Sequence, residues 1–71
     1  MSLQKFKKNL RKLISANDMP YTEVARKSET ALTQIHVYIN PKKKVSPNAT
    51  TLERLADALG VTMDELYRGD L

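Results

Sequence analysis

The chain has 71 residues, no cysteine and a net charge of +4. A chain of this length forms one domain, so we expect residues 1–71 to fold as a single unit around a small core. The lack of cysteine excludes disulfides and thiolate metal sites, which fits a reducing cytoplasm. No apolar run approaches the roughly 20 residues of a membrane span, and no signal peptide is recognisable, so we expect a soluble intracellular protein.

The first predicted helix spans residues 3–16. Apolar residues recur there at three- and four-residue spacing, and lysines and arginines occupy the other faces. The apolar positions are Leu3, Phe6, Leu10, Leu13 and Ile14. A basic amphipathic helix can also lie on an anionic membrane, but this stripe lacks tryptophan and is needed for the core.

Two short helices are predicted next, over residues 20–27 and 31–40. Pro20 suits the first turn of the earlier helix, and Thr30 stands where it can cap the later one. The residues expected to face the core are Val24, Ala25, Ile35, Tyr38 and Ile39. Helices of about two turns are not stable alone, so both must rely on packing. A pair of short helices joined by a tight break is typical of a helix-turn-helix.

The fourth predicted helix spans residues 49–59, after Asn48 as its N-cap, and a glycine follows its last residue. Thr62 and Glu65 have capping-box spacing, which predicts a fifth helix over residues 63–68. No segment alternates with period two, so we expect no sheet. The expected fold is therefore all-α, with five helices and the helix-turn-helix at the second and third.

Positive charge is concentrated in the first part of the chain. Residues 1–44 hold ten Lys and Arg against three acidic residues, a balance of +7, whereas residues 45–71 have a balance of −3. One face can therefore attract a polyanion while the opposite end stays away from it.

The outer face of the third predicted helix carries groups suited to reading DNA bases. Thr33 and Gln34 can hydrogen-bond base edges in the major groove, and Leu32 and Val37 can contact thymine methyl groups. The candidates for phosphate contact around this face are Tyr21, Thr22, Lys27, Asn40, Lys42, Lys43 and Lys44. The pattern predicts binding to double-stranded DNA, with the helix over residues 31–40 in the major groove.

Residues 50–69 read TTLERLADALGVTMDELYRG. This segment resembles the Cro and CI-type repressors of lambdoid phages and their bacterial XRE-type relatives, and the middle of the chain matches more loosely. The resemblance runs from about residue 10 to residue 69, and the short chain looks most like a Cro protein. It implies a compact lambda-repressor-like fold and a repressor in the bacterial host cytoplasm that binds pseudo-palindromic operator DNA as a homodimer and blocks polymerase.

The resemblance also assigns site residues. The base-contacting positions of the family correspond to Leu32, Thr33 and Val37, with Gln34 and His36 alongside. Several relatives use glutamine there, so we expect thymine methyl contacts to matter more in this chain than bidentate adenine recognition. A dimer surface is expected near the last two helices, with the apolar candidates Val45, Pro47, Val61, Met63, Tyr67 and Leu71.

Three departures from the family pattern carry expectations of their own. Tyr21 replaces the common glutamine at the start of the second helix, and its phenol can still donate to phosphate. Glu29 replaces a glycine in the turn, from which we expect a turn of different shape. Ile14 and Ile39 stand where relatives often pair Arg with Glu, and we expect these two side chains to touch in the core.

Other functions fit the sequence less well. An antitoxin-like or controller protein whose main partner is another protein would want an extra exposed apolar segment. Recognition of single-stranded RNA usually needs exposed aromatic platforms. An enzyme is disfavoured because His36 is the sole histidine, and capping explains Asp64 and Glu65 better than metal binding. We expect no catalytic residue, metal, cofactor, small-molecule ligand or membrane contact.

Overall fold

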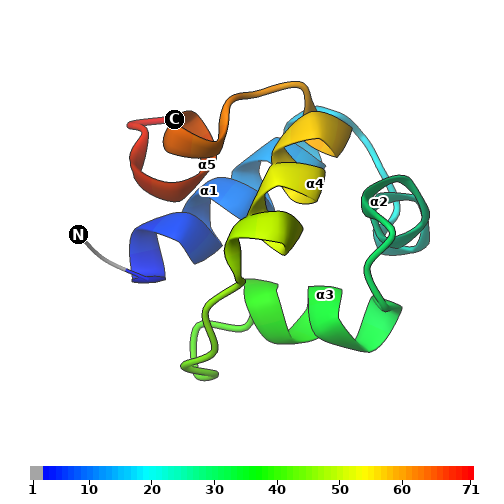
Figure 1. Cartoon of the computed structure of the whole chain (residues 1–71), viewed down its shortest axis with the longest axis horizontal. Helices are drawn as coiled ribbons and strands as arrows, with labels where there is room; N and C mark the ends of the chain where they lie inside the picture. The colour runs from blue at the N-terminus through cyan, green and yellow to red at the C-terminus, as the bar shows by residue number, and fades with distance from the viewer. Residues whose placement is uncertain (1–2) are drawn as a thin grey trace.

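A computed structural model describes residues 3–71, and these residues form helices without any strand. The predicted all-α, five-helix fold is therefore confirmed. The second helix begins and ends one residue later than predicted, and the third begins one residue later and ends one residue earlier. Residues 1–2 of the predicted domain lie outside the described part. The helices are α1 (Leu3–Ala16), α2 (Tyr21–Ser28), α3 (Leu32–Ile39), α4 (Ala49–Leu59) and α5 (Met63–Arg68) (Figure 1).

One hydrophobic core joins all five helices. Its fully buried side chains are Phe6, Leu10, Val24, Ile35, Leu55 and Leu66. Tyr38 packs edge-on against Phe6, with ring centroids 6.2 Å apart. Burial of one such side chain contributes about 1.5–3 kcal/mol, which is how helices too short to persist alone are held together.

The N-termini of α4 and α5 are capped by the side chains of the residues that directly precede them. Asn48 accepts a 2.8 Å hydrogen bond from the backbone N–H of Thr51. At α5, Thr62 and Glu65 form the predicted capping box, each accepting from the other's backbone N–H at 3.0 and 2.9 Å. Gly60 ends α4 in the left-handed conformation with φ of 74°. The predicted caps of this half are confirmed.

The helices α2 and α3 begin without side-chain caps. Pro20 and Ala31 are their N-cap residues, and neither makes a side-chain capping bond. The prediction that Thr30 caps α3 is wrong, because its Oγ1 donates to the backbone oxygen of Ser28 at 3.2 Å. Thr30 belongs instead to the end of α2, since its N–H donates to the oxygen of Ala25 at 3.0 Å.

The turn between α2 and α3 has the left-handed geometry that glycine adopts easily. Glu29 has φ of 53° and ψ of 39°, and the expected difference in turn shape from the relatives remains a prediction. Val24 before the turn and Ile35 after it are both fully buried. Burial of these two side chains stabilises this path of the chain. That stabilisation offsets the strain of the positive φ at Glu29. Its carboxylate lies 3.9 Å from the guanidinium of Arg54.

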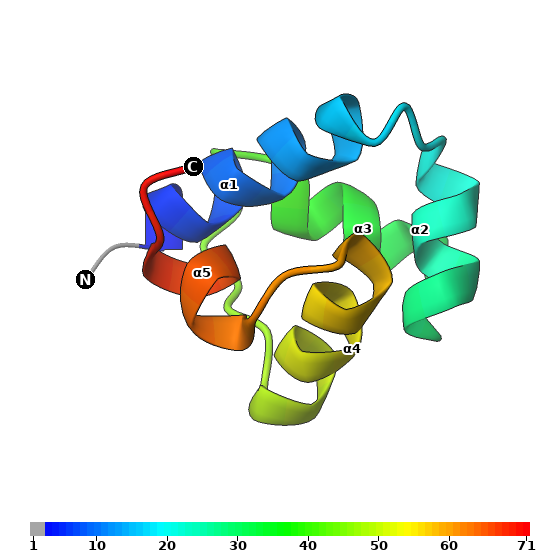
Figure 2. The ribbon, with the colours of Figure 1, turned by 90° about the horizontal axis from the view of Figure 1, so that it is seen from above.

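The arrangement leaves α3 along one edge of the molecule. In Figure 1, α3 runs along the lower edge, the loop at residues 40–48 hangs beside its C-terminal end, and α5 lies at the opposite side. Seen from above in Figure 2, α1 and α4 lie on either side of the molecule, with α2 at the end away from the termini. The most basic loop and the outer face of α3 therefore share one side.

Candidate nucleic-acid interface

The outer face of α3 is open to solvent along most of its length. Leu32 is 37% exposed, which is high for a large apolar side chain, whereas Ile35, one turn further along the helix, is fully buried. The other predicted base-contacting residues are exposed, except that the last is half-buried; they are Thr33, Gln34, His36 and Val37. The structure thus brings all five residues onto one helix, four of them on a surface accessible to a large ligand.

The start of α2 touches this face through an aromatic contact. The Tyr21 ring packs edge-on against the His36 imidazole, with centroids 5.4 Å apart. Tyr21 is a predicted phosphate contact and His36 a predicted base contact. Their packing means that one surface spans both helices of the helix-turn-helix.

The predicted phosphate contacts differ in how strongly they already interact within the chain. Lys42, Lys43 and Lys44 are exposed, and Thr22 is exposed at the start of α2. Asn40 is half-buried, and its Oδ1 accepts from the N–H of Lys42 at 2.9 Å, which shapes the start of the basic loop.

Lys27 lies within a small charged group on α2. Its Nζ lies 4.0 Å from Glu23, and Arg26 makes a closer ion pair with the same carboxylate at 2.7 Å. The hydrogen bond from Arg26, together with the charges of Arg26 and Lys27, lowers the pKa of Glu23. The charge of Lys27 is therefore partly compensated by Glu23, whereas no ion pair is seen for the three loop lysines among the described residues.

The C-terminal end of α3 is bound by cations of α1 that the sequence analysis placed on outer faces. Lys7 is fully buried, and its Nζ donates to the backbone oxygens of Val37 and Tyr38 at 3.0 and 3.1 Å. Arg11 donates to the oxygen of Ile39 at 2.9 Å. Burial lowers the pKa of Lys7, and the charge of Arg11 acts in the same direction.

The role of Lys7 was missed, although the sequence carried a signal. Lys7 stands four residues after Leu3 and three before Leu10, where the helical spacing of the stripe calls for an apolar residue. A charged residue at such a position is a candidate for a specific buried partner. Part of the positive charge counted in residues 1–44 is therefore used inside the protein.

The predicted contact between Ile14 and Ile39 remains a prediction. Ile14 is 4% exposed and belongs to the core, and Ile39 is half-buried and packs against that core. The burial that the contact would require is therefore present at one position and partial at the other.

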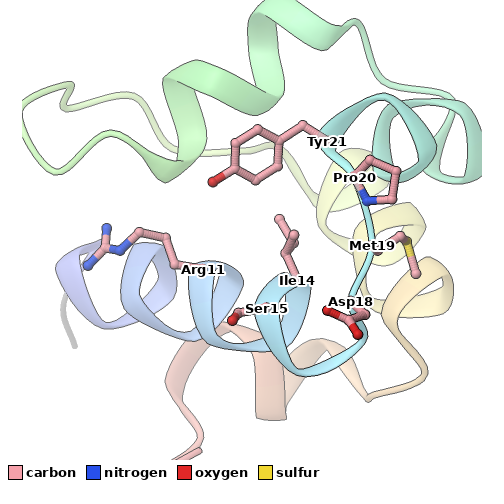
Figure 3. A pocket seen from close by; sticks show the side chains of 7 residues that line it. All are labelled: Arg11, Ile14, Ser15, Asp18, Met19, Pro20 and Tyr21. Carbon is pink, nitrogen blue, oxygen red and sulfur yellow. The ribbon is translucent and has the colours of Figure 1, made fainter.

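A hollow lies beside the start of α2, close to the α3 face. It is lined by Arg11, Ile14, Ser15, Asp18, Met19, Pro20 and Tyr21. Figure 3 shows the Tyr21 ring across the hollow from Ile14, with its hydroxyl on the side where Arg11 lies. Arg11 is a further exposed cation next to a predicted phosphate contact, which the sequence analysis did not single out.

Of the six predicted dimer residues, three pack against the core and three do not. Val61, Met63 and Tyr67 are half-buried against the core, and the Tyr67 ring lies 5.7 Å from that of Phe6. Val45 is 45% exposed. The remaining two candidates are a half-buried Pro47 and a 39% exposed Leu71.

Two further features were sought in residues 3–71, a metal-binding group and a membrane-spanning helix. Over residues 3–71, no group of three or more His, Cys, Asp or Glu side chains could hold a metal ion. None of the helices in this range combines the length and apolarity that crossing a bilayer requires.

Five packed helices, with a partly exposed α3 that follows α2 after a tight turn, define a helix-turn-helix DNA-binding domain. The sequence matches the family described as the Cro/C1-type HTH DNA-binding domain over residues 9–68. The chain belongs to this family, and its partner is double-stranded DNA. Searches of curated proteins and of solved structures gave no match.

Proposed function

We propose that the protein is a Cro-like transcriptional repressor, with residues 1–71 acting as one DNA-binding domain in the bacterial cytoplasm. It binds a pseudo-palindromic operator as a homodimer, places α3 in the major groove, and blocks polymerase sterically. The observation that carries this proposal is the exposure of Leu32, Thr33 and Gln34 on α3, together with three exposed lysines in the loop that follows this helix. Such a surface can read bases and bind phosphates at once.

The contacts divide by chemistry. Leu32, Thr33, Gln34, His36 and Val37 meet base edges, and apolar contact with thymine methyl groups gives much of the discrimination. The residues that bind phosphate are Tyr21, Thr22, Lys27, Asn40, Lys42, Lys43 and Lys44. The uncapped first turns of α2 and α3 add backbone N–H groups that favour an anion.

The dimer surface is built around the loop before α4 and the end of the chain that contains α5. Ser46 Oγ and Tyr67 Oη lie 3.4 Å apart, so the loop is joined to α5. The contact residues are Val45, Pro47, Val61, Met63 and Tyr67. Because three of these also complete the core of one copy, the exposed area left for a partner is small, and the dimer is weak until DNA holds both copies.

Selection from random duplex DNA, followed by binding across a salt series, tests the proposal. The selected site should be a pseudo-palindrome with half-site centres about 10 base pairs apart. The logarithm of affinity should fall with the logarithm of salt concentration by about 0.9 for each phosphate neutralised. Failure to enrich any duplex sequence, or binding of isolated half-sites without cooperativity, would contradict the proposal.

The Leu32→Ala and Val37→Ala variants test the thymine contacts. Each should weaken binding to the selected duplex more than binding to a scrambled one. Leu32 gives the cleaner result, because it is exposed whereas Val37 is half-buried. Equal losses on both duplexes would show that these side chains do not read bases.

A further inference from the structure

A row of polar side chains on α1 binds the backbone where α3 ends. Gln4, Lys7 and Arg11 follow one another at three- and four-residue spacing, so they lie on one face of the helix. Gln4 Nε2 donates to the oxygen of Pro41 at 3.0 Å. Lys7 and Arg11 bind three carbonyls at the end of α3, those of residues 37, 38 and 39. We call these three α1 residues the carbonyl clamp.

The clamp lies where the α3 backbone has few partners of its own. The last carbonyls of a helix lack intrahelical donors, and cations favour that end of the helix dipole. The N–H of Asn40 donates to the oxygen of Val37, which closes the last turn of α3. The other end of α3 has no side-chain cap at Ala31. Contacts at its C-terminal end therefore add to the core packing of Ile35 and Tyr38 in fixing α3 on the domain.

Lys7 is the central member of the clamp. It is fully buried, and the partners of its ammonium are backbone oxygens of α3. The bonds lie on the inner side of α3, away from the exposed Thr33 and Gln34. Lys7 can thus affect how α3 is presented without itself reaching a DNA base or phosphate.

We propose that Lys7, supported by Arg11 and Gln4, is a positioning residue for sequence recognition: it fixes the end of α3 so that its outer face meets the bases at the correct angle. This inference rests on the proposed role of α3 in reading DNA. It adds that sequence specificity depends on a lysine that makes no contact with the DNA.

The test replaces Lys7 with Met, which keeps an unbranched stem and removes the ammonium. The Lys8→Met variant is the matched control, because it makes the same charge change at an exposed position of the same helix. Global stability is a poor readout here, since the lost carbonyl bonds and the relief of a buried charge have opposite effects.

The first readout is amide hydrogen exchange in the DNA-free protein. In Lys7→Met, amides of α3 should exchange about tenfold faster, because both carbonyl bonds are lost and the relief of the buried charge offsets only part of that loss, while those of α4 should not change. Lys8→Met should match the wild type. Unchanged exchange in α3 would overturn the clamp, whatever the protein binds.

The second readout is the affinity ratio between the selected duplex and a scrambled duplex. Lys7→Met should lower this ratio about tenfold, with an unchanged salt slope, because no phosphate contact is lost. A wild-type ratio would overturn the positioning role, and so would a slope reduced by about 0.9, which would indicate a phosphate contact. If the wild-type chain selects no duplex, the proposed repressor function fails, and hydrogen exchange alone then decides whether Lys7 fixes α3.

Discussion

The two helix pairs of this domain begin in opposite ways. In α4 and α5, the side chains of Asn48, Thr62 and Glu65 satisfy first-turn N–H groups. In α2 and α3, the N-cap residues Pro20 and Ala31 leave those groups without a side-chain partner. The pair α4–α5 therefore has local stabilisation of its own, while α2–α3 depends on the core and on packing against α4 and α1. We propose that this difference separates a supporting half, α4–α5, from a DNA-reading half, α2–α3, whose first-turn N–H groups bind phosphate.

The largest expected effect concerns the core that both halves share. Ile35→Ala in α3 and Leu66→Ala in α5 should each lower the free energy of unfolding by about 2–5 kcal/mol, because both side chains are fully buried. Denaturant unfolding measures both values. A much smaller loss for Ile35 would show that the helix-turn-helix half is not fixed to the common core.

The capping residues of α4 and α5 should contribute more to the free energy of unfolding than Thr30, which precedes α3. Asn48→Ala and Thr62→Ala should each lower the free energy of unfolding by about 1 kcal/mol. Thr30→Ala is the matched control, because Thr30 precedes α3 but does not cap it. Equal losses for Thr30 and Thr62, measured by thermal or denaturant unfolding, would remove the contrast between the halves.

Adding a cap to α3 should separate stability from DNA binding. Ala31 has extended backbone angles of −61° and 141°, which suit an N-cap residue. Ala31→Asp should therefore stabilise the protein by up to about 1 kcal/mol and weaken DNA binding, since its carboxylate occupies first-turn donors and repels phosphate.

The Ala31→Ser variant separates the two causes of weaker binding, because serine can cap without adding charge. It should give part of the stabilisation and a smaller loss of affinity in a direct binding titration. If Ala31→Asp binds DNA as tightly as the wild type, the open N-terminus of α3 takes no part in phosphate binding.

The turn between α2 and α3 offers a smaller gain. Glu29→Gly should raise the free energy of unfolding by about 0.5–1 kcal/mol, because glycine adopts a positive φ without the strain of a Cβ. The loss of the ion pair with Arg54 offsets little of this, since both side chains are largely exposed. A destabilised Glu29→Gly variant in chemical denaturation would mean that this ion pair outweighs the backbone strain.

The smallest expected effect is the pH response of α2. Because Arg26 and Lys27 lower the pKa of Glu23, the stability from this group is present above the usual glutamate pKa. It is lost as pH falls through the lowered folded pKa. Titration by NMR should show the Glu23 pKa below the usual glutamate range, and Arg26→Gln should move it upward. An unchanged Glu23 pKa in that variant would reject the assignment.

The parts of the fold that sequence reasoning predicted are those decided by near neighbours. The cap at Asn48 and the box at Thr62 and Glu65 involve residues three apart, so their spacing is visible in the chain. The outward face of α3 followed from helical periodicity alone. Thr30 was misjudged because two local structures compete for it, the end of α2 and the start of α3, and packing of the turn selects the first.

The polar contacts of α1 could not be read from local sequence. Lys7 binds carbonyls about 30 residues away, and the buried Asn9 donates to the backbone oxygens of Leu66 and Gly69. Both positions interrupt the apolar pattern, so an irregularity was visible. Its partners are set by how α1 crosses α3 and α5, which spacing along one helix does not reveal. For the same reason, a count of charges overstated how many α1 cations face outward.

The most direct test of the central claim compares the outer face of α3 with the basic loop. The measurement is the affinity ratio between a selected and a scrambled duplex across a salt series. Changing Leu32, Thr33 and Gln34 together to Ala should reduce the ratio to near unity and leave the salt slope unchanged. Changing Lys42, Lys43 and Lys44 together to Met should keep the ratio and lower the slope by about 0.9 for each lysine that binds phosphate. A ratio that survives the α3 changes would contradict the claim that this helix reads the DNA sequence.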